Sequence, residues 1–214
     1  MLEPKKGLLT FRAEGDDFKG GRNYSRKIHW PGVFSGCAKN NSGVTIGRGF
    51  DLGDRSKQEI ITELRRAGIP NDQASKIAGA AGLKGCLAGD YVKNNKEDIG
   101  EISDYQQLKL FEVTYNAIEN DVKRICQKSA TIKAYHPNPK ALLGQAWQDI
   151  PDKIKEVLID LRYRGDYTPH IRSLLQRHAY AGDVPGFGRI LSNRDLWPKV
   201  PQERFFRRVR FYEN

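Results

Sequence analysis

The chain has 214 residues, of which 38% are hydrophobic and 29% are charged. This length allows a buried core, and the balance of residue types excludes a disordered chain and a membrane-embedded protein. Lys and Arg total 36 against 26 Asp and Glu, so the formal net charge is +10 and polyanions such as nucleic acids and bacterial envelopes are attracted. Because no nucleic-acid-binding signature accompanies the charge, we expect no nucleic-acid partner.

The cysteines and histidines show no spacing typical of a metal site. Cys37, Cys86 and Cys126 lie far apart in the sequence. An odd number leaves at least one thiol free, and the wide spacing implies no disulfide framework, although the state of each thiol stays open. With no CxxC pair and with 4 scattered histidines, the sequence predicts neither a metal nor another cofactor.

The N-terminal residues lack the apolar region of an export signal, and no stretch is long enough to span a membrane. We therefore expect a monomeric protein without a transmembrane segment that is made in the cytoplasm. If its substrate lies in the periplasm or cell wall, a pore, a secretion machine or a fused domain must deliver it. Whether the chain is a fragment of a larger protein stays open.

The first predicted element is a short helix that ends near Glu14-Gly15, where the glycine suits a helix stop. Residues 16–53 are rich in glycine and contain Val44-Thr45-Ile46, a run with β-forming residues. These residues predict a small β-sheet or hairpin lobe, and residues 54–214 predict a helical lobe. We expect the two lobes to form one domain over residues 1–214.

Two capping patterns mark helix starts in the second part of the chain. Ser56 to Glu59 begins a helix that should stop at Gly68-Ile69-Pro70, and Ser103 to Gln106 begins a long helix with one apolar stripe. Proline and glycine residues separate further predicted helices, which cover approximately residues 140–148, 151–163, 171–179 and 202–212.

The most specific pattern is SGVTIGRGFDLG at residues 42–53, preceded by RAEG at residues 12–15. It resembles the catalytic lobe of pesticin-type muramidases and, more distantly, of phage T4-type lysozymes. The resemblance implies a lysozyme-like α+β fold that hydrolyses the β-1,4 bond between N-acetylmuramic acid and N-acetylglucosamine. Matching motif positions implies that Glu14 is the general acid and that Thr45 and Asp51 hold the attacking water.

The chemistry of glycoside hydrolysis explains why such a group is needed. One protonated carboxyl must donate to the leaving oxygen, and an ionised carboxylate must act from the other side of the sugar. We expect Glu14 to stay protonated against apolar neighbours and Asp51 to stay ionised among glycines. The separation of the two carboxyl groups decides between inversion and retention. Sequence does not reveal this separation, and the resemblance favours inversion.

Strand alternation offers a further expectation for the motif. In one regular strand Thr45 and Asp51 would point to the same side, but a turn at Gly47 to Gly49 would break that parity. In the preceding loop, residues 20–42, three aromatic side chains could stack on sugar rings or pack the loop itself. They are Tyr24, His29 and Trp30.

Three residues are predicted to contact the substrate. One is Arg48 within the motif. The others are Tyr163 and Arg164, in a stretch that resembles a helix end beside the cleft of related enzymes. A structural role is the alternative for Tyr163 and Arg164.

The catalytic residues also have simpler interpretations. Glu14 could be a surface carboxylate, Thr45 a β-former, and Asp51 the N-cap of the next helix. Asp16 and Asp17 could compete as the acid, although their position beside glycine suggests a solvated turn.

The function likewise has an alternative, a non-catalytic peptidoglycan-binding domain of the same fold. The expected partner is the glycan strand of peptidoglycan in either case. A phage endolysin, a bacteriocin and a secreted antibacterial effector would share this pattern, and an effector would also have an immunity protein.

Overall fold

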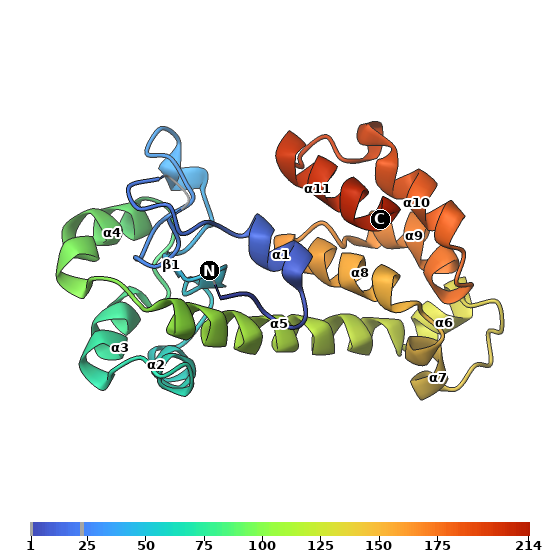
Figure 1. The fold of residues 1–214 in the computed structure, drawn as a ribbon, viewed down its shortest axis with the longest axis horizontal. Coiled ribbons are helices and arrows are strands. Elements are labelled where there is room, and N and C mark those ends of the chain that lie inside the picture. Colours follow the sequence, from blue (N-terminus) through green and yellow to red (C-terminus); the bar gives the residue numbers. More distant parts are fainter. Residues whose placement is uncertain (1, 22–23) are drawn as a thin grey trace. The chain divides into compact units, whose positions relative to one another are not determined.

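The computed structural model describes residues 2–21 and 24–214 (Figure 1). The chain divides into two compact units, Met1–Thr114 and Tyr115–Asn214, with the boundary inside helix α5 (Asp104–Cys126). Helices predominate in the described residues, and a two-stranded antiparallel sheet lies in the first unit. The chain therefore belongs to the predicted α+β class.

The first unit contains the hairpin and several helices. Its elements are α1 (Leu8–Ala13), η1 (Cys37–Lys39), β1 (Thr45–Ile46), β2 (Phe50–Asp51), α2 (Lys57–Arg66), α3 (Asn71–Ile77), η2 (Ala78–Ala80), α4 (Gly85–Ile99) and the first part of α5. The predicted β lobe of residues 16–53 is thus one part of a larger compact unit.

One face of the hairpin is covered by the hydrophobic core of the first unit. Val44, Ile46, Phe50 and Leu52 are each at most 1% exposed and belong to the core cluster that also includes residues of α2, α3 and α4. Side chains alternate between the two faces of a strand. The residues between these four, including Thr45, therefore point to the opposite face.

The predicted helix boundaries in the first unit are confirmed. Ser56 accepts a hydrogen bond from the Glu59 amide, and the Glu59 side chain caps the Ser56 amide in return. The following helix stops before Gly68, whose φ of 81° lies in the left-handed region that favours glycine. The amide of Gln106 donates to Ser103 Oγ and the amide of Ser103 to Gln106 Oε1, so the second capping pattern also starts its helix.

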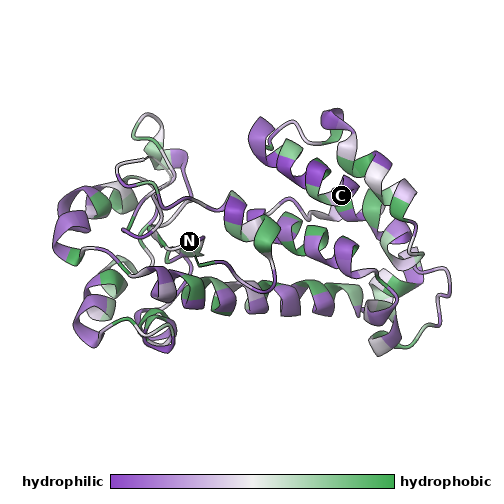
Figure 2. Ribbon diagram, in the orientation of Figure 1, coloured by the Kyte–Doolittle hydropathy of each residue, from purple (hydrophilic) through white to green (hydrophobic). Residues whose placement is uncertain are grey.

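The second unit is helical throughout its regular structure in the described residues. It contains the end of α5 and then α6 (Ser129–Tyr135), α7 (Leu143–Gln148), α8 (Asp152–Arg164), α9 (Pro169–Tyr180), α10 (Val184–Ser192), η3 (Arg194–Leu196) and α11 (Gln202–Glu213). Figure 2 shows hydrophobic and hydrophilic residues in turn along these helices, as amphipathic packing requires. No helix in the part of the chain that the structure describes is long and apolar enough to cross a membrane.

A buried ion network joins α8 to α11 within the second unit. Asp160, with 0% exposure, accepts hydrogen bonds from Arg204 Nη2 at 2.7 Å and from Arg208 Nε at 2.5 Å. Arg208 also donates to Asp166 at 2.8 Å. Burial acts to raise the pKa of Asp160, but the two arginines outweigh it and the pKa is lowered. Each oxygen of this carboxylate therefore accepts from an arginine guanidinium.

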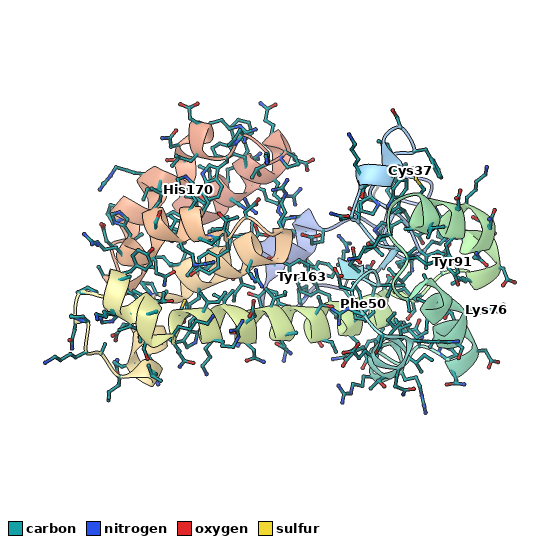
Figure 3. All side chains as sticks on the ribbon, turned by 180° about the vertical axis from the view of Figure 1, so that it is seen from behind. Cys37, Phe50, Lys76, Tyr91, Tyr163 and His170 are labelled. Carbon is teal, nitrogen blue, oxygen red and sulfur yellow. A yellow bond between two sulfur atoms is a disulfide. The ribbon has the colours of Figure 1, made fainter. Side chains whose placement is uncertain are left out.

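A disulfide connects Cys37 in η1 with Cys86 in α4, and Figure 3 labels Cys37 in this part of the first unit. Their Cα atoms are 4.9 Å apart, although 49 positions separate them in the sequence. The spacing in the sequence does not imply this bond and leaves the state of each thiol open; folding brings the widely spaced pair together. Cys126 is free and buried, which confirms that one thiol remains.

Candidate functional site

The central feature of the site is a row of three side chains across the hairpin face that points away from the core. Thr45 pairs directly with Asp51 in the antiparallel register, and an antiparallel bridge pairs Thr45 with His29 on its other side. Directly opposed residues in antiparallel pairs project to the same face, with Cβ atoms about 4.5 to 5.5 Å apart. His29, Thr45 and Asp51 therefore lie in order on one face.

The shared face arises from a turn and not from one regular strand. The chain reverses between β1 and β2, where Gly47 and Gly49 adopt φ values of 65° and 87°. Of the two alternatives that the sequence leaves open, the turn at Gly47 to Gly49 is the one observed. The pairing of Thr45 with Asp51 nevertheless places the two side chains on one side of the hairpin.

Backbone amides on two segments orient the Asp51 carboxylate. Gly53 N donates to Oδ1 at 2.6 Å and Gly43 N donates to Oδ2 at 3.2 Å. A Cβ on Gly43 would collide with this carboxylate and with the backbone of Gly53, so the site requires a residue without a side chain there. Asp51 does not cap the next helix, because Ser56 does so. The N-cap interpretation of Asp51 is therefore wrong.

The Thr45 hydroxyl is not engaged by neighbouring groups of the protein. The backbone of Thr45 bonds to His29 in both directions, at 2.8 and 2.9 Å. The hydroxyl makes no hydrogen bond to any described residue, and Thr45 is 6% exposed. A hydroxyl both donates and accepts, so this group can orient one water molecule beside Asp51.

Glu14 lies where the sequence predicts it, at the end of the first helix. It is the C-cap residue of α1, and its amide donates to the Thr10 carbonyl at 3.0 Å. Leu9 and Phe11 of the same helix are buried and anchor it, while Glu14 itself is half-buried. Glu14 is therefore held at a defined helix end and is more enclosed than an ordinary surface carboxylate.

Arg48 occupies the interior of the first unit, with 2% exposure. Its guanidinium donates to the carbonyls of Phe11, at 3.1 Å, and Gly15, and to the Asp17 carboxylate at 3.0 Å. It also lies over the Phe11 ring, 4.3 Å from the centroid. The prediction that Arg48 contacts substrate does not fit this burial, because its donors bind groups within the protein.

Arg48 instead connects the hairpin turn to the segment that carries Glu14. Two of its acceptors, the carbonyls of Phe11 and Gly15, lie on either side of Glu14 in the sequence. Burial lowers the pKa of Arg48, and the charges of Asp17, Asp16 and Glu14 oppose that effect. The structure thus brings the end of α1 and the hairpin into one polar cluster.

Asp17 does not lie in the solvated turn that the sequence suggests. It pairs with Arg48 and accepts a hydrogen bond from Gln107 at 2.9 Å. Asp16 accepts from the Phe18 amide at 3.0 Å and is also half-buried. The carboxylate of Asp17 thus binds Arg48 and Gln107. The carboxylate of Asp16 accepts a hydrogen bond from the local backbone.

The aromatic residues of the preceding loop have different roles. Tyr24 is 5% exposed and donates to Glu101 at 2.6 Å, which supports a packing role. Trp30 donates to the Ser42 carbonyl at 3.2 Å and packs against Phe34 with ring centroids 5.4 Å apart. Of the three candidates for sugar stacking, His29 alone pairs with Thr45. The sequence does not reveal this pairing, because the bridge joins His29 of the loop to Thr45 of the motif, two residues that are distant in the chain.

Burial lowers the pKa of His29, and the charge of Lys96 adds to that effect. The charge of Asp51 acts in the opposite direction, as does the hydrogen bond with the Lys27 carbonyl. His29 Nδ1 lies 3.1 Å from that carbonyl oxygen. Because a carbonyl only accepts, Nδ1 carries the hydrogen and Nε2 of the neutral ring carries the lone pair.

Tyr163 and Arg164 lie at the end of α8 in the second unit, where Figure 3 labels Tyr163. Arg164 donates to the Asp166 carboxylate and to the Lys199 carbonyl, the latter at 2.6 Å. Its guanidinium is thus engaged with neighbouring groups of the same unit, and Tyr163 is half-buried. Glycan contact by these two residues stays a prediction.

Residues 2–21 and 24–214 contain no group of three or more His, Cys, Asp or Glu side chains arranged to hold a metal ion. The Asp51 carboxylate and the Thr45 hydroxyl are groups that can support proton transfer with a positioned water.

The sequence matches the model of a protein family. A family described as Domain of unknown function (DUF8812) matches residues 7–209, and thus covers most of both compact units. No curated protein matches the chain.

Proposed function

We propose from the site described above that this chain, which belongs to the DUF8812 family, is a lysozyme-like muramidase. It would hydrolyse the β-1,4 bond between N-acetylmuramic acid and N-acetylglucosamine in peptidoglycan. The observation that carries this proposal is the pairing of Thr45 with Asp51 on the hairpin face that points away from the core. Arg48 bonds the turn of this hairpin to the helix end that presents Glu14.

In the proposed reaction, Glu14 donates a proton to the glycosidic oxygen as the bond from that oxygen to the anomeric carbon breaks. Water attacks the anomeric carbon, and its proton passes to Asp51. Thr45 orients the water by donating or accepting a hydrogen bond. Attack from the face opposite the leaving group inverts the anomeric centre, and the products are two shorter glycan strands.

The polar groups around Asp51 support its assignment as the base. Its oxygens accept hydrogen bonds from backbone amides, which orient the carboxylate without supplying a cationic partner. No described Lys, Arg or His forms an ion pair with this side chain. The carboxylate is therefore oriented by the protein without being neutralised by a cation.

Arg48 takes a positioning role in this proposal and replaces the predicted substrate contact. Its planar guanidinium satisfies acceptors from three residues at once, which a lysine ammonium cannot match in geometry. The carbonyls of Phe11 and Gly15 are fixed relative to the hairpin turn by these bonds. These bonds therefore also fix the position of Glu14, the proposed acid, which lies between Phe11 and Gly15.

The proposed site of action is the cell wall or periplasm. Disulfides persist in oxidising compartments, among them the bacterial periplasm. The bond between Cys37 and Cys86 suits such a destination. An endolysin, a bacteriocin or a secreted effector would each act there, and an effector would need an immunity protein in the producing cell.

The proposal is tested with purified peptidoglycan and two matched variants. Glu14→Gln should abolish release of soluble fragments while keeping binding to the insoluble polymer. Glu97→Gln is the control, because the side chain of Glu97 is 81% exposed on α4. Release of fragments by Glu14→Gln at the wild-type rate would overturn the assignment of the acid. Binding without cleavage by the wild-type protein would instead identify a non-catalytic binding domain.

A further inference from the structure

His29 is a titratable residue that the proposed reaction does not use. It lies beside Thr45, which is directly opposite Asp51, so the three side chains share one face. The hydrogen bonds between His29 and Thr45, at 2.9 and 2.8 Å, make this a closely fixed pair. A histidine in this position can influence the water that Thr45 and Asp51 are proposed to hold.

The ring is oriented by the backbone of its own segment. Its Nδ1 donates to the Lys27 carbonyl, which leaves the lone pair on Nε2. Nε2 has no hydrogen-bond partner among the described residues of the chain. In the neutral state this nitrogen therefore offers a hydrogen-bond acceptor to water.

Two charged groups act on the ring from opposite directions. Lys96 of α4 disfavours a second positive charge, and Asp51 of β2 favours it. Removal of the ring from water also disfavours the charged form, and this is the largest effect. The neutral ring is therefore the resting state near neutral pH.

We propose that His29 is a positioning residue of the hydrolytic site, whose uncharged ring keeps the attacking water oriented and whose protonation stops hydrolysis in acid. This inference rests on the proposed muramidase function. Protonation would convert Nε2 from acceptor to donor. It would also place a cation on the same face as Asp51, which stabilises the carboxylate and weakens it as a base.

The proposal predicts a particular acid limb in the pH dependence of kcat. An unperturbed histidine has a pKa of about 6.5, and that of His29 is lowered, so wild-type kcat should fall on the acid side of this value. The comparison is made at the acid pH where the wild type retains about a tenth of its neutral kcat, with little change in KM. His29→Gln and His29→Asn cannot titrate in this range and should retain more than about half of their own neutral kcat.

His170→Gln is the matched control. His170 is exposed on α9, as Figure 3 shows, and belongs to the second unit. Its replacement should leave the acid limb unchanged. Circular dichroism over the same pH range separates loss of activity from unfolding, and the two different replacements of His29 guard against a folding defect in one of them.

A second measurement does not depend on turnover. NMR titration of the His29 ring should show that Asp51→Asn lowers the pKa of His29, because an attractive negative charge is lost. Lys96→Gln should raise the pKa, because a repulsive positive charge is lost. Both responses are expected if the charges act on the ring as the structure indicates.

The outcomes separate this inference from the proposed function. Active wild-type enzyme with the same acid limb in His29→Gln would overturn the role of His29 alone. An unshifted pKa of His29 in both Asp51→Asn and Lys96→Gln would also overturn it. Wild-type protein that never cleaves peptidoglycan would overturn the proposed function, and the acid switch with it.

Discussion

Asp51 in the first unit and Asp160 in the second are held in opposite ways. Asp160 is fully buried, and its oxygens accept from Arg204 and Arg208. Asp51 is half-buried, and its oxygens accept from the amides of Gly43 and Gly53. Paired cations neutralise a carboxylate and fix a structure, whereas neutral amides orient a carboxylate and leave its charge available. The first arrangement suits packing, and the second suits proton transfer.

The largest expected effect is loss of hydrolysis in Asp51→Asn. Removing a positioned acid or base costs about 10² to 10⁴ in rate, so kcat should fall within that range. The free energy of unfolding should fall by only about 1 kcal/mol, because the asparagine side chain loses about one hydrogen bond to a backbone amide. Fragment release and chemical denaturation measure the two quantities. Asp54→Asn is the control, because the Asp54 side chain is 87% exposed, and equal rates for both variants would contradict the assignment of Asp51.

Asp160→Asn should show the reverse pattern. Loss of the charge removes one counter-ion from Arg204 and from the buried Arg208, and breaking such a buried pair costs about 3 to 5 kcal/mol of stability. Chemical denaturation measures this loss, with Asp152→Asn as the exposed control on the same helix. Activity per folded molecule should remain. An Asp160→Asn variant as stable as the wild type would contradict the structural role of Asp160 and hence its contrast with Asp51.

The pairing of Asp160 also predicts acid sensitivity. Its pKa is lowered in the folded protein, so its contribution is complete above the unfolded value of about 3.9. The contribution is lost as the pH falls through the lower folded value, because protonation then breaks the pairs. Denaturation curves at decreasing pH should show this loss in the wild type and not in Asp160→Asn.

Reduction of the disulfide between Cys37 and Cys86 should lower the stability of the first unit by no more than the loss expected for Asp160→Asn. The cysteines are separated by 49 positions, for which the chain-entropy relation gives about 4 kcal/mol. Thermal unfolding with and without a thiol reductant measures the effect. Cys37→Ser combined with Cys86→Ser should unfold at the temperature of the reduced wild type and should not respond to reductant. If reductant still lowered the unfolding temperature of the double variant, the destabilisation would not come from the bond between Cys37 and Cys86.

The smallest expected effect is that of Arg48→Lys. A lysine retains the charge but not the planar fork, so the end of α1 should be held less well. We expect kcat to fall by about tenfold with KM unchanged, because the interaction acts on catalytic geometry and not on substrate binding. Steady-state kinetics on soluble glycan fragments provide both constants. A rise in KM at constant kcat would restore the substrate-contact interpretation.

Local signals in the sequence predicted a large part of the fold. The capping patterns at Ser56 and Ser103 and the stop at Gly68 act over a few residues, and the structure confirms each of them. The helices α3, α4, α6 and α10 were not predicted. Two of these, α4 and α10, contain internal glycines that weaken the helical pattern, and tertiary packing compensates for them.

The site was predictable only in part, because its long-range contacts leave no local pattern. The motif indicated Glu14, Thr45 and Asp51, but their catalytic roles remain proposals. Arg48 stands between two glycines, and no local pattern indicates that folding buries it against α1. The pairing of His29 with Thr45 likewise depends on the tertiary fold.

The central claim is that the site of Glu14 and Asp51 hydrolyses a muramic acid linkage with water. Its most direct test is mass spectrometry of peptidoglycan fragments after digestion in ¹⁸O-labelled water and borohydride reduction of a matched unlabelled digest. We predict N-acetylmuramic acid at each new reducing end, with one ¹⁸O incorporated before reduction. New ends that carry N-acetylglucosamine, or an anhydro sugar without ¹⁸O, would contradict the account.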